Sequence, residues 1–200
     1  MDYYERIAAH CQDSINAIAL SVDQLADGLQ RGCDLMTTSL LADGKIITCG
    51  NGAGAALAQL FASNLLGRFS QERPALPALA LGADSASLTG IAGSSGGNEV
   101  FSRQLRALGQ PGDVLLCINS GDDSPSLLRA VQAALERNMA VILLSHAQDT
   151  ELGTLIRAED VELRIDAPGP GQLAEVQTLA LNLCCELIEQ NLFGPLQQDG

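Results

Sequence analysis

The sequence has few basic and few aromatic side chains. Its 200 residues include 11 Lys and Arg against 24 Asp and Glu, which gives a formal net charge of −13, and there is no Trp. The basic residues are scattered, and Lys45 is the single lysine. Binding of nucleic acid depends on clustered basic side chains that neutralise phosphates, so direct nucleic-acid binding is disfavoured. The acidic excess favours solubility and leaves a basic protein partner open.

Long apolar runs and paired cysteine motifs are also missing. No apolar run reaches the length of a membrane span, and the polar start MDYYERIAAHCQDS does not resemble a signal peptide. The cysteines lie mostly in apolar runs without C-x-x-C spacing, at positions 11, 33, 49, 117, 184 and 185. This pattern is typical of buried thiols in a reducing cytoplasm, not of disulfides or a zinc site. We expect a cytoplasmic protein without membrane contact, metal or other cofactor.

What the sequence does contain is an alternation of strand-like and helix-like segments. Residues 1–42 carry apolar side chains at helical spacing, and we expect two helices that divide near Arg31 and Gly32. Short apolar runs of strand type follow at 46–50, 77–81, 113–119, 140–145 and 161–165. Helical patterns lie at 54–66, 84–92, 98–108, 125–137, 151–157 and 172–191. This alternation predicts an α/β protein, a three-layer αβα sandwich around a five-stranded parallel sheet.

The length suits a single domain with a full core. We expect residues 1–200 to form this domain, with N-terminal helices in 1–42 and the αβα core in 43–200. The N-terminal helices carry more apolar face than one small sheet needs, and the helix at 172–191 is apolar on most sides. Helices of this kind must be buried, so we expect residues 1–42 to serve in homo-oligomerisation.

Three loops at the carboxyl ends of the expected strands are rich in small residues: 50-GNGAGA-55, 93-GSSGGN-98 and 118-INSGDDSP-125. Ser124 is a good N-cap and Pro125 a good first helical residue, so backbone amides should face the third loop. Amides from two such loops would form an anion pocket at the sheet edge where ligands bind. Each loop alone is equally consistent with a tight turn. The candidate ligand-binding residues are Asn51, Gly52, Ala53, Gly54, Ser94, Asn119, Ser120, Gly121 and Ser124.

The first loop also matches the letters of a dinucleotide-binding motif, G-x-G-x-x-A. That motif requires an acidic residue about 20 positions later, at the end of the second strand, and Asp84 lies too far along. A phosphate-binding loop of the Walker A type needs Gly-Lys-Ser/Thr, which the sequence lacks. A nucleotide ligand is therefore disfavoured.

Several segments resemble the sugar isomerase (SIS) domain family: 49-CGNG-52, 72-ERPALPALAL-81, 99-EVFSRQLRALGQPGDVLL-116 and 184-CCELIE-189. The resemblance covers nearly the whole chain and is most specific at 99–116. It is closest to the branch that holds phosphoheptose isomerases and the DnaA initiator-associating proteins. It implies the flavodoxin-like SIS fold and a homotetramer with pockets at subunit interfaces.

Membership of this branch does not decide activity, because isomerases and regulators share the fold. The isomerisation moves a proton between adjacent sugar carbons, which requires a base and a group that polarises the carbonyl. The resemblance implies that the isomerases' first-helix His and Glu correspond to Leu60 and Asn64. Their last-helix Gln and His correspond to Ala174 and Asn182. None of these side chains accepts a proton at neutral pH, so we assign neither a catalytic nor a metal-binding residue.

Other residues offer weak substitutes for the missing groups. His146 follows the fourth strand, and we interpret it as an exposed loop histidine. The other histidine, His10, lies in the first helix. Glu175 in the last helix could approach the pocket, but its sequence neighbours carry no partner at ligand spacing.

The phosphate loop itself differs from the pattern of the isomerases, STSGNS, because Asp122 and Asp123 stand where they have Gly and Asn. Two like charges at 4 Å repel by ~4 kcal/mol at an effective dielectric of 20. We therefore expect weak sugar-phosphate binding, with one of these carboxylates facing the loop amides. Alternatively, both are solvated residues that favour the helix start.

These observations predict a catalytically silent SIS protein that acts by protein binding, with DnaA as the partner that the resemblance implies. Asn182 agrees with the initiator-associating branch, whereas Leu60 replaces a histidine that this branch keeps. The alternatives are a sedoheptulose 7-phosphate isomerase of heptose and lipopolysaccharide biosynthesis, and a sensor of another small metabolite.

Overall fold

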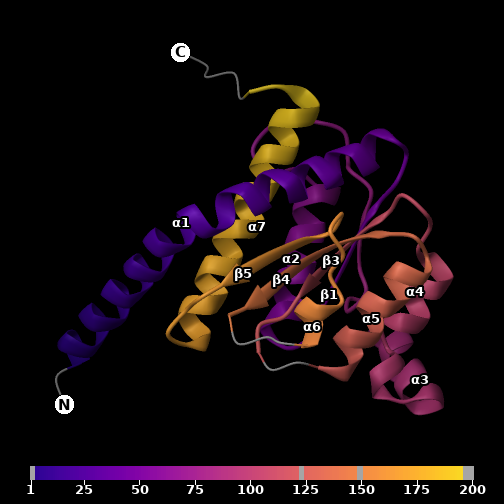
Figure 1. The fold of residues 1–200 in the computed structure, drawn as a ribbon, viewed down its shortest axis with the longest axis horizontal. Coiled ribbons are helices and arrows are strands. Elements are labelled where there is room, and N and C mark those ends of the chain that lie inside the picture. The colour runs from indigo at the N-terminus through magenta and orange to yellow at the C-terminus, as the bar shows by residue number, and fades with distance from the viewer. Residues whose placement is uncertain (1–2, 122–123, 148–150, 196–200) are drawn as a thin grey trace.

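The fold is given by a computed structural model that describes residues 3–121, 124–147 and 151–195 (Figure 1). All five strands lie where the sequence predicts them, and β5 matches residue for residue. The elements are α1 (Tyr3–Leu41), β1 (Ile46–Gly50), α2 (Ala53–Leu66), β2 (Ala78–Ala80), α3 (Ser85–Ser95), the 3₁₀ helix η1 (Gly97–Glu99), α4 (Ser102–Leu108), β3 (Val114–Ile118), α5 (Pro125–Glu136), β4 (Ala140–His146), α6 (Glu151–Thr154), β5 (Val161–Ile165) and α7 (Pro170–Phe193).

The strands form one parallel sheet in the order β2-β1-β3-β4-β5. This is the flavodoxin-like order, in which the chain moves outward from β1 to β2 and then returns to β3 on the other side of β1. The reversal places the carboxyl ends of β1 and β3 side by side, with Gly50 level with Ile118. The predicted fold class is confirmed, and the reversal point is where the candidate loops begin.

The sheet separates two apolar cores, because successive side chains of each strand point to opposite faces. Helices α1, α2 and α7 cover one face, and α4, α5 and α6 cover the other. Figure 1 shows α3, α4 and α5 gathered away from α1 and α7. The first face presents Ile46, Val114, Leu116, Ile118, Ile142 and Leu144, and the second presents Ile47, Cys49, Leu115, Cys117, Val141 and Leu143.

The N-terminal segment is one continuous helix, so the prediction of two helices divided near Arg31 and Gly32 is wrong. A glycine inside a helix costs about 1 kcal/mol relative to alanine, which packing on either side can outweigh. Here Gly32 is buried against the side chain of Ile142, and Leu29, Cys33 and Met36 beside it belong to the core. Close packing of helix on sheet therefore explains a glycine that resembles a break in the sequence.

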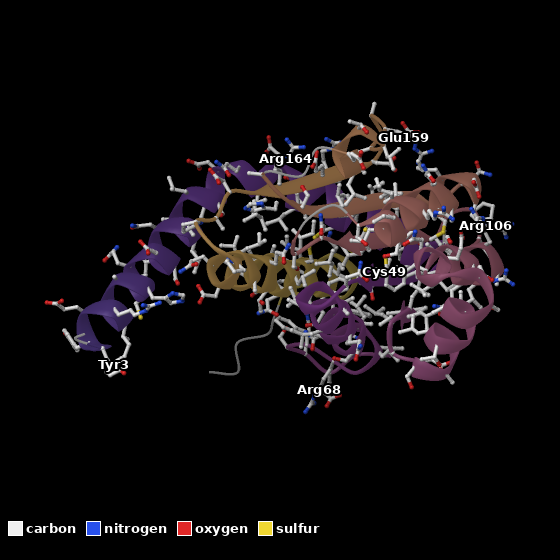
Figure 2. The ribbon with its side chains drawn as sticks, turned by 90° about the horizontal axis from the view of Figure 1, so that it is seen from below. Tyr3, Cys49, Arg68, Arg106, Glu159 and Arg164 are labelled. Carbon is white, nitrogen blue, oxygen red and sulfur yellow. The ribbon has the colours of Figure 1, made fainter. Side chains whose placement is uncertain are left out.

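The first part of α1 extends beyond the rest of the molecule, and Figure 2 shows Tyr3 at its far tip. Burial on this helix begins at Ala17, whereas Ile7, Ile15, Leu20 and other large apolar side chains are exposed. Within the part of the chain that is described, no helix combines the length and apolar character needed to cross a membrane.

One buried ion pair ties the connection between α2 and β2 to α7. Nε of Arg73 lies 2.8 Å from Oε1 of Glu189, and the two side chains are 0% and 1% exposed. Glu189 also accepts hydrogen bonds from the backbone amides of Phe69 and Ser70, while Arg73 donates to the backbone carbonyl of Asn64. The guanidinium thus binds a carbonyl in the last turn of α2, and the carboxylate binds amides of the connection that follows it.

Candidate functional site

The candidate site lies where β1 and β3 end. The turn after β1 leads through Asn51 and Gly52 into α2, and the loop after β3 leads through Asn119 and Ser120 toward α5. Both helices begin at this edge, so their first backbone amides point into the crevice between the two strand ends. The predicted pairing of these two loops is therefore present in the fold.

Glycines let the turn after β1 pack closely on the end of β3. Gly52 has φ of +54°, a conformation that other residues rarely adopt. A Cβ at Gly54 would lie 2.6 Å from the carbonyl oxygen of Ile118 and 3.3 Å from Oγ of Ser120. The first turn of α2 therefore sits against the loop after β3, and a serine at position 54 would not fit without a shift of the backbone.

Asn51 links the first turn to the start of α5. Its side-chain amide nitrogen donates to Oγ of Ser124 and to Oγ of Ser126, each at 3.0 Å. The two serine hydroxyls are themselves 3.0 Å apart. Ser124 occupies the predicted N-cap position and Pro125 follows it, but the Ser124 side chain makes no capping bond to the helix. Its hydroxyl instead accepts the hydrogen bond from Asn51, on the other side of the crevice.

The loop after β3 is held from the opposite side by Gln177 of α7. Nε2 of Gln177 donates to the carbonyl oxygen of Asn119 at 2.7 Å, and Ser120 Oγ donates to Oε1 of Gln177 at 2.5 Å. The backbone amide of Gly121 donates to Oδ1 of Asn119 at 3.3 Å. Among the described residues, Nδ2 of Asn119 is a buried donor that has no partner.

Sequence reasoning missed Gln177 and Ser126. Both are polar side chains that are buried at helix positions facing the core. A glutamine between Leu173 and Leu181, four positions from each, interrupts an otherwise apolar helical face, and that interruption is the signal that could have identified it.

Ser94 does not join this group in the structure. The segment predicted as a loop at 93–98 is largely helical, because α3 continues to Ser95 and η1 follows at Gly97. The hydroxyl of Ser94 donates to the carbonyl oxygen of Gly90 within the same exposed helix. A serine hydroxyl readily donates a hydrogen bond to a carbonyl of its own helix, and Ser94 does so in the last turn of α3.

The four positions that correspond to isomerase groups lie on α2 and α7. Leu60 is 40% exposed and lines a shallow apolar groove between α2 and β2. Asn64 is half-buried, and its side chain counteracts in part the burial that raises the pKa of the Cys185 thiol on α7. Asn182 lies one helical turn before Cys185 and is half-buried, as is Ala174. The described side chains at these positions include no acid, base or imidazole.

Of the two histidines, His10 lies in the first helix as expected, whereas His146 does not lie in a loop. His146 is the last residue of β4 and is half-buried in register with Ile165, so it is not an exposed loop residue. His10 lies beside the first turns of α7, where Nδ1 is 3.0 Å from Nε2 of Gln172 and Nε2 is 3.6 Å from Glu175. The partner of Glu175, which its sequence neighbours did not reveal, thus comes from α1.

Neither thiol chemistry nor a metal cluster is evident at the site. Burial raises the pKa of the Cys185 thiol to about 12, and a hydrogen bond with Cys117 together with burial raises that of Cys49. Both thiols stay protonated and unreactive at neutral pH. Within residues 3–121, 124–147 and 151–195, no three His, Cys, Asp or Glu side chains lie close enough together to hold a metal ion. Asp122 and Asp123 lie outside these residues.

Comparison with known proteins agrees with this fold. The family model of the SIS domain matches residues 10–145. A phosphoheptose isomerase of Chromohalobacter salexigens is 41% identical over 97% of this chain and 98% of its own. The DnaA initiator-associating protein DiaA of Photorhabdus laumondii is also 41% identical, over 98% of this chain and 99% of its own.

Solved structures of the same kind superpose on nearly the whole chain. A phosphoheptose isomerase from Francisella tularensis is 33% identical, with a TM-score of 0.91 over 95% of this chain and all of its own. One from Neisseria gonorrhoeae is 36% identical, with a TM-score of 0.89 over 94% of this chain and all of its own. The chain belongs to the SIS domain family. Phosphoheptose isomerases and a DnaA initiator-associating protein match it at similar identity, so overall similarity does not decide between the two.

Proposed function

We propose that this protein is a catalytically silent SIS-domain protein that acts by binding another protein. The observation that supports this is the set of side chains on α2 and α7, where Leu60, Asn64, Ala174 and Asn182 replace the groups that the isomerase reaction needs. Asparagine and leucine can neither remove nor return a carbon-bound proton at neutral pH. The DiaA relative suggests DnaA as the partner and the start of DNA replication as the process.

Two further parts of the proposal concern assembly and location. The exposed apolar side chains of α1, such as Ile7 and Ile15, need a covering surface, and a homotetramer would supply it. Residues 1–42 would then serve in oligomerisation, with 43–200 as the ligand-binding core of a single domain. Free buried thiols such as Cys33 and Cys184 fit a cytoplasmic protein.

A coupled assay with sedoheptulose 7-phosphate, with and without added zinc, tests catalytic silence. Loss of one acid–base group reduces a rate by about 10²–10⁴-fold, so activity should be absent or trace. Turnover near that of ordinary enzymes, about 1–10³ s⁻¹, would instead establish the alternative, an isomerase of heptose and lipopolysaccharide biosynthesis.

Binding of purified DnaA, measured by surface plasmon resonance, tests the partner. A phosphoheptose isomerase of known activity, immobilised in parallel, is the matched control. Saturable binding by this protein and not by the control supports the proposal. Equal signals on both surfaces, or none on either, would contradict it.

A further inference from the structure

Gln177 connects the last helix to the loop that should bind the ligand. It is fully buried, at 0% exposed, and its amide makes two short contacts with consecutive loop residues. Nε2 lies 2.7 Å from the carbonyl oxygen of Asn119, and Oε1 lies 2.5 Å from Oγ of Ser120. Loop shape at the strand end thus depends on a residue that the sequence pattern did not identify.

The direction of these two hydrogen bonds follows from the chemistry of the groups. A carbonyl oxygen can only accept, so the nitrogen of the Gln177 amide must face Asn119. The amide oxygen then faces Ser120, and because that oxygen can only accept as well, the hydroxyl must donate. A serine hydroxyl carries one hydrogen. Ser120 therefore has lone pairs, and no donor, left for a ligand.

Ser120 lies within the crevice between the two candidate loops. Its Oγ is 3.3 Å from the place that a Cβ at Gly54 would take, beside the first turn of α2. The amide of Asn51, another side-chain donor of the crevice, gives both of its hydrogens to Ser124 and Ser126. Ser120 and Asn51 therefore already donate to the protein, whereas Nδ2 of Asn119 has no partner among the described residues.

We propose that Gln177 determines the specificity of this site. Gln177 accepts the one hydrogen bond that the Ser120 hydroxyl can donate. The loop then accepts a hydrogen bond from a ligand hydroxyl and does not donate one to a phosphate. The inference rests on the proposed function in one respect: the ligand of the core at 43–200 is the sugar phosphate, or similar carbohydrate derivative, that the sequence leads us to expect. Phosphoryl oxygens are acceptors that charge-assisted donors bind best. A sugar hydroxyl can donate, so Ser120 suits the neutral part of the ligand.

A double-mutant cycle on Gln177 and Ser120 tests the proposal by calorimetry with inorganic phosphate. Gln177→Met frees the Ser120 hydrogen and should strengthen phosphate binding about tenfold, the effect of one hydrogen bond to a charged group. Ser120→Ala should then reduce the affinity for phosphate by a factor about ten times larger in the Gln177→Met protein than in the protein that keeps Gln177. A merely structural role of Gln177 predicts the opposite, since a damaged loop would bind phosphate less well.

The controls separate specificity from damage to the fold. Thr178→Val alters the neighbouring residue of α7, whose hydroxyl bonds within the helix to Ala174, and should leave phosphate binding as it is. Gln177→Asn keeps an amide but is one methylene too short for both contacts, so it provides a second variant if Gln177→Met does not fold. Sedoheptulose and sedoheptulose 7-phosphate, titrated in parallel, should show the gain for the phosphate ester alone.

The phosphate-binding measurements can fail without contradicting the proposed function, and the reverse also holds. Unchanged or weaker phosphate binding by folded Gln177→Met and Gln177→Asn would overturn the role of Gln177. Equal losses from Ser120→Ala in both backgrounds would overturn it too. Neither result bears on the isomerase and DnaA assays, which judge the proposed function without reference to this hydrogen bond.

Discussion

Replacement of Glu189 by glutamine should destabilise the protein more than any surface charge change of the same kind. The Glu189 side chain is 1% exposed and pairs with Arg73, which is 0% exposed. It also accepts hydrogen bonds from the Phe69 amide at 3.0 Å, the Ser70 amide at 3.0 Å and the Ser70 hydroxyl at 2.6 Å. Glu189→Gln replaces one carboxylate oxygen by an NH₂ group and keeps the size of the side chain, so it tests the charge and its hydrogen bonds.

The magnitude follows from what the change leaves behind. Burial raises the pKa of Glu189, but hydrogen bonds from Ser70, Phe69 and Arg73 outweigh this and hold the pKa below its usual range. The carboxylate is therefore charged at neutral pH. In the variant, the Arg73 charge stays buried without a counter-charge, and the new NH₂ group meets donors. Removing one partner of a buried pair costs about 3–5 kcal/mol.

Thermal and denaturant unfolding of the two proteins measure this cost. For a chain of this size, 1 kcal/mol lowers the melting temperature by about 2–4 °C, so the expected decrease is roughly 6–20 °C. Glu72→Gln is the matched control, because Glu72 pairs with Arg68 at the surface, where the side chains are 84% and 62% exposed. Exposed pairs contribute at most about 1 kcal/mol.

Equal melting temperatures for Glu189→Gln and Glu72→Gln would refute the reasoning. A second comparison tests whether the unpaired buried charge of Arg73 causes the destabilisation. The double variant Arg73→Met with Glu189→Leu leaves no buried charge, so it should recover part of the loss. Recovery should be incomplete, because the amides of Phe69 and Ser70 would still lack the acceptor that the carboxylate provides.

Other measurements test the assembly, the acid stability and the phosphate loop. Light scattering at micromolar concentration should give about four times the chain mass of 20.9 kDa, and a monomer would contradict the proposed tetramer; Ile15→Glu should weaken assembly without unfolding the chain. Burial raises the pKa of Asp160 and of Glu189, but hydrogen bonds and an arginine beside each carboxylate outweigh it and lower both pKa values. Both carboxylates therefore stabilise the fold at pH values above their unfolded-state pKa of about 4. The free energy of unfolding should decrease as the pH falls below that value. A melting temperature independent of pH from 6 to about 3 would contradict this. Asp122→Gly with Asp123→Asn should strengthen phosphate binding by removing negative charge, and unchanged affinity in calorimetry would favour solvated aspartates.

The order of elements was predictable because each strand is a short, continuous apolar run that needs no partner to be recognised. Of three departures, two have tertiary causes and one is local. Gly32 lies in an unbroken helix because the sheet packs against it. The local departure is Ser94, which lies in the last turn of a helix that its Gly-rich surroundings obscured. His146 belongs to β4 because the pairing with β5 extends to Ile165.

The backbone of the site was predictable, whereas the use of its side chains was not. Turn residues and the helix start at Pro125 have local signatures, so the two loops could be located from the sequence. The choice of partner by Asn51 and Ser120 depends on residues 73 and 57 positions away, respectively. The partners Arg73 and Glu189 are 116 positions apart. Polar side chains inside apolar segments show that a buried contact is needed, but not which group supplies it.

These contacts explain how a SIS domain can keep its fold without binding or converting a substrate. A site that must bind an anion usually keeps donors unpaired, and such donors are costly when buried. In this chain Asn51 donates to Ser124 and Ser126, Ser120 donates to Gln177, and Gln177 donates to the carbonyl oxygen of Asn119. Gly54 packs its backbone directly against the loop after β3, and among the described residues of the crevice Nδ2 of Asn119 stays unpaired. The crevice therefore holds its shape without a ligand. A domain whose fold does not depend on its substrate can present its outer surface to a protein partner whether or not a sugar phosphate is bound. The proposed regulatory function requires this independence from the ligand.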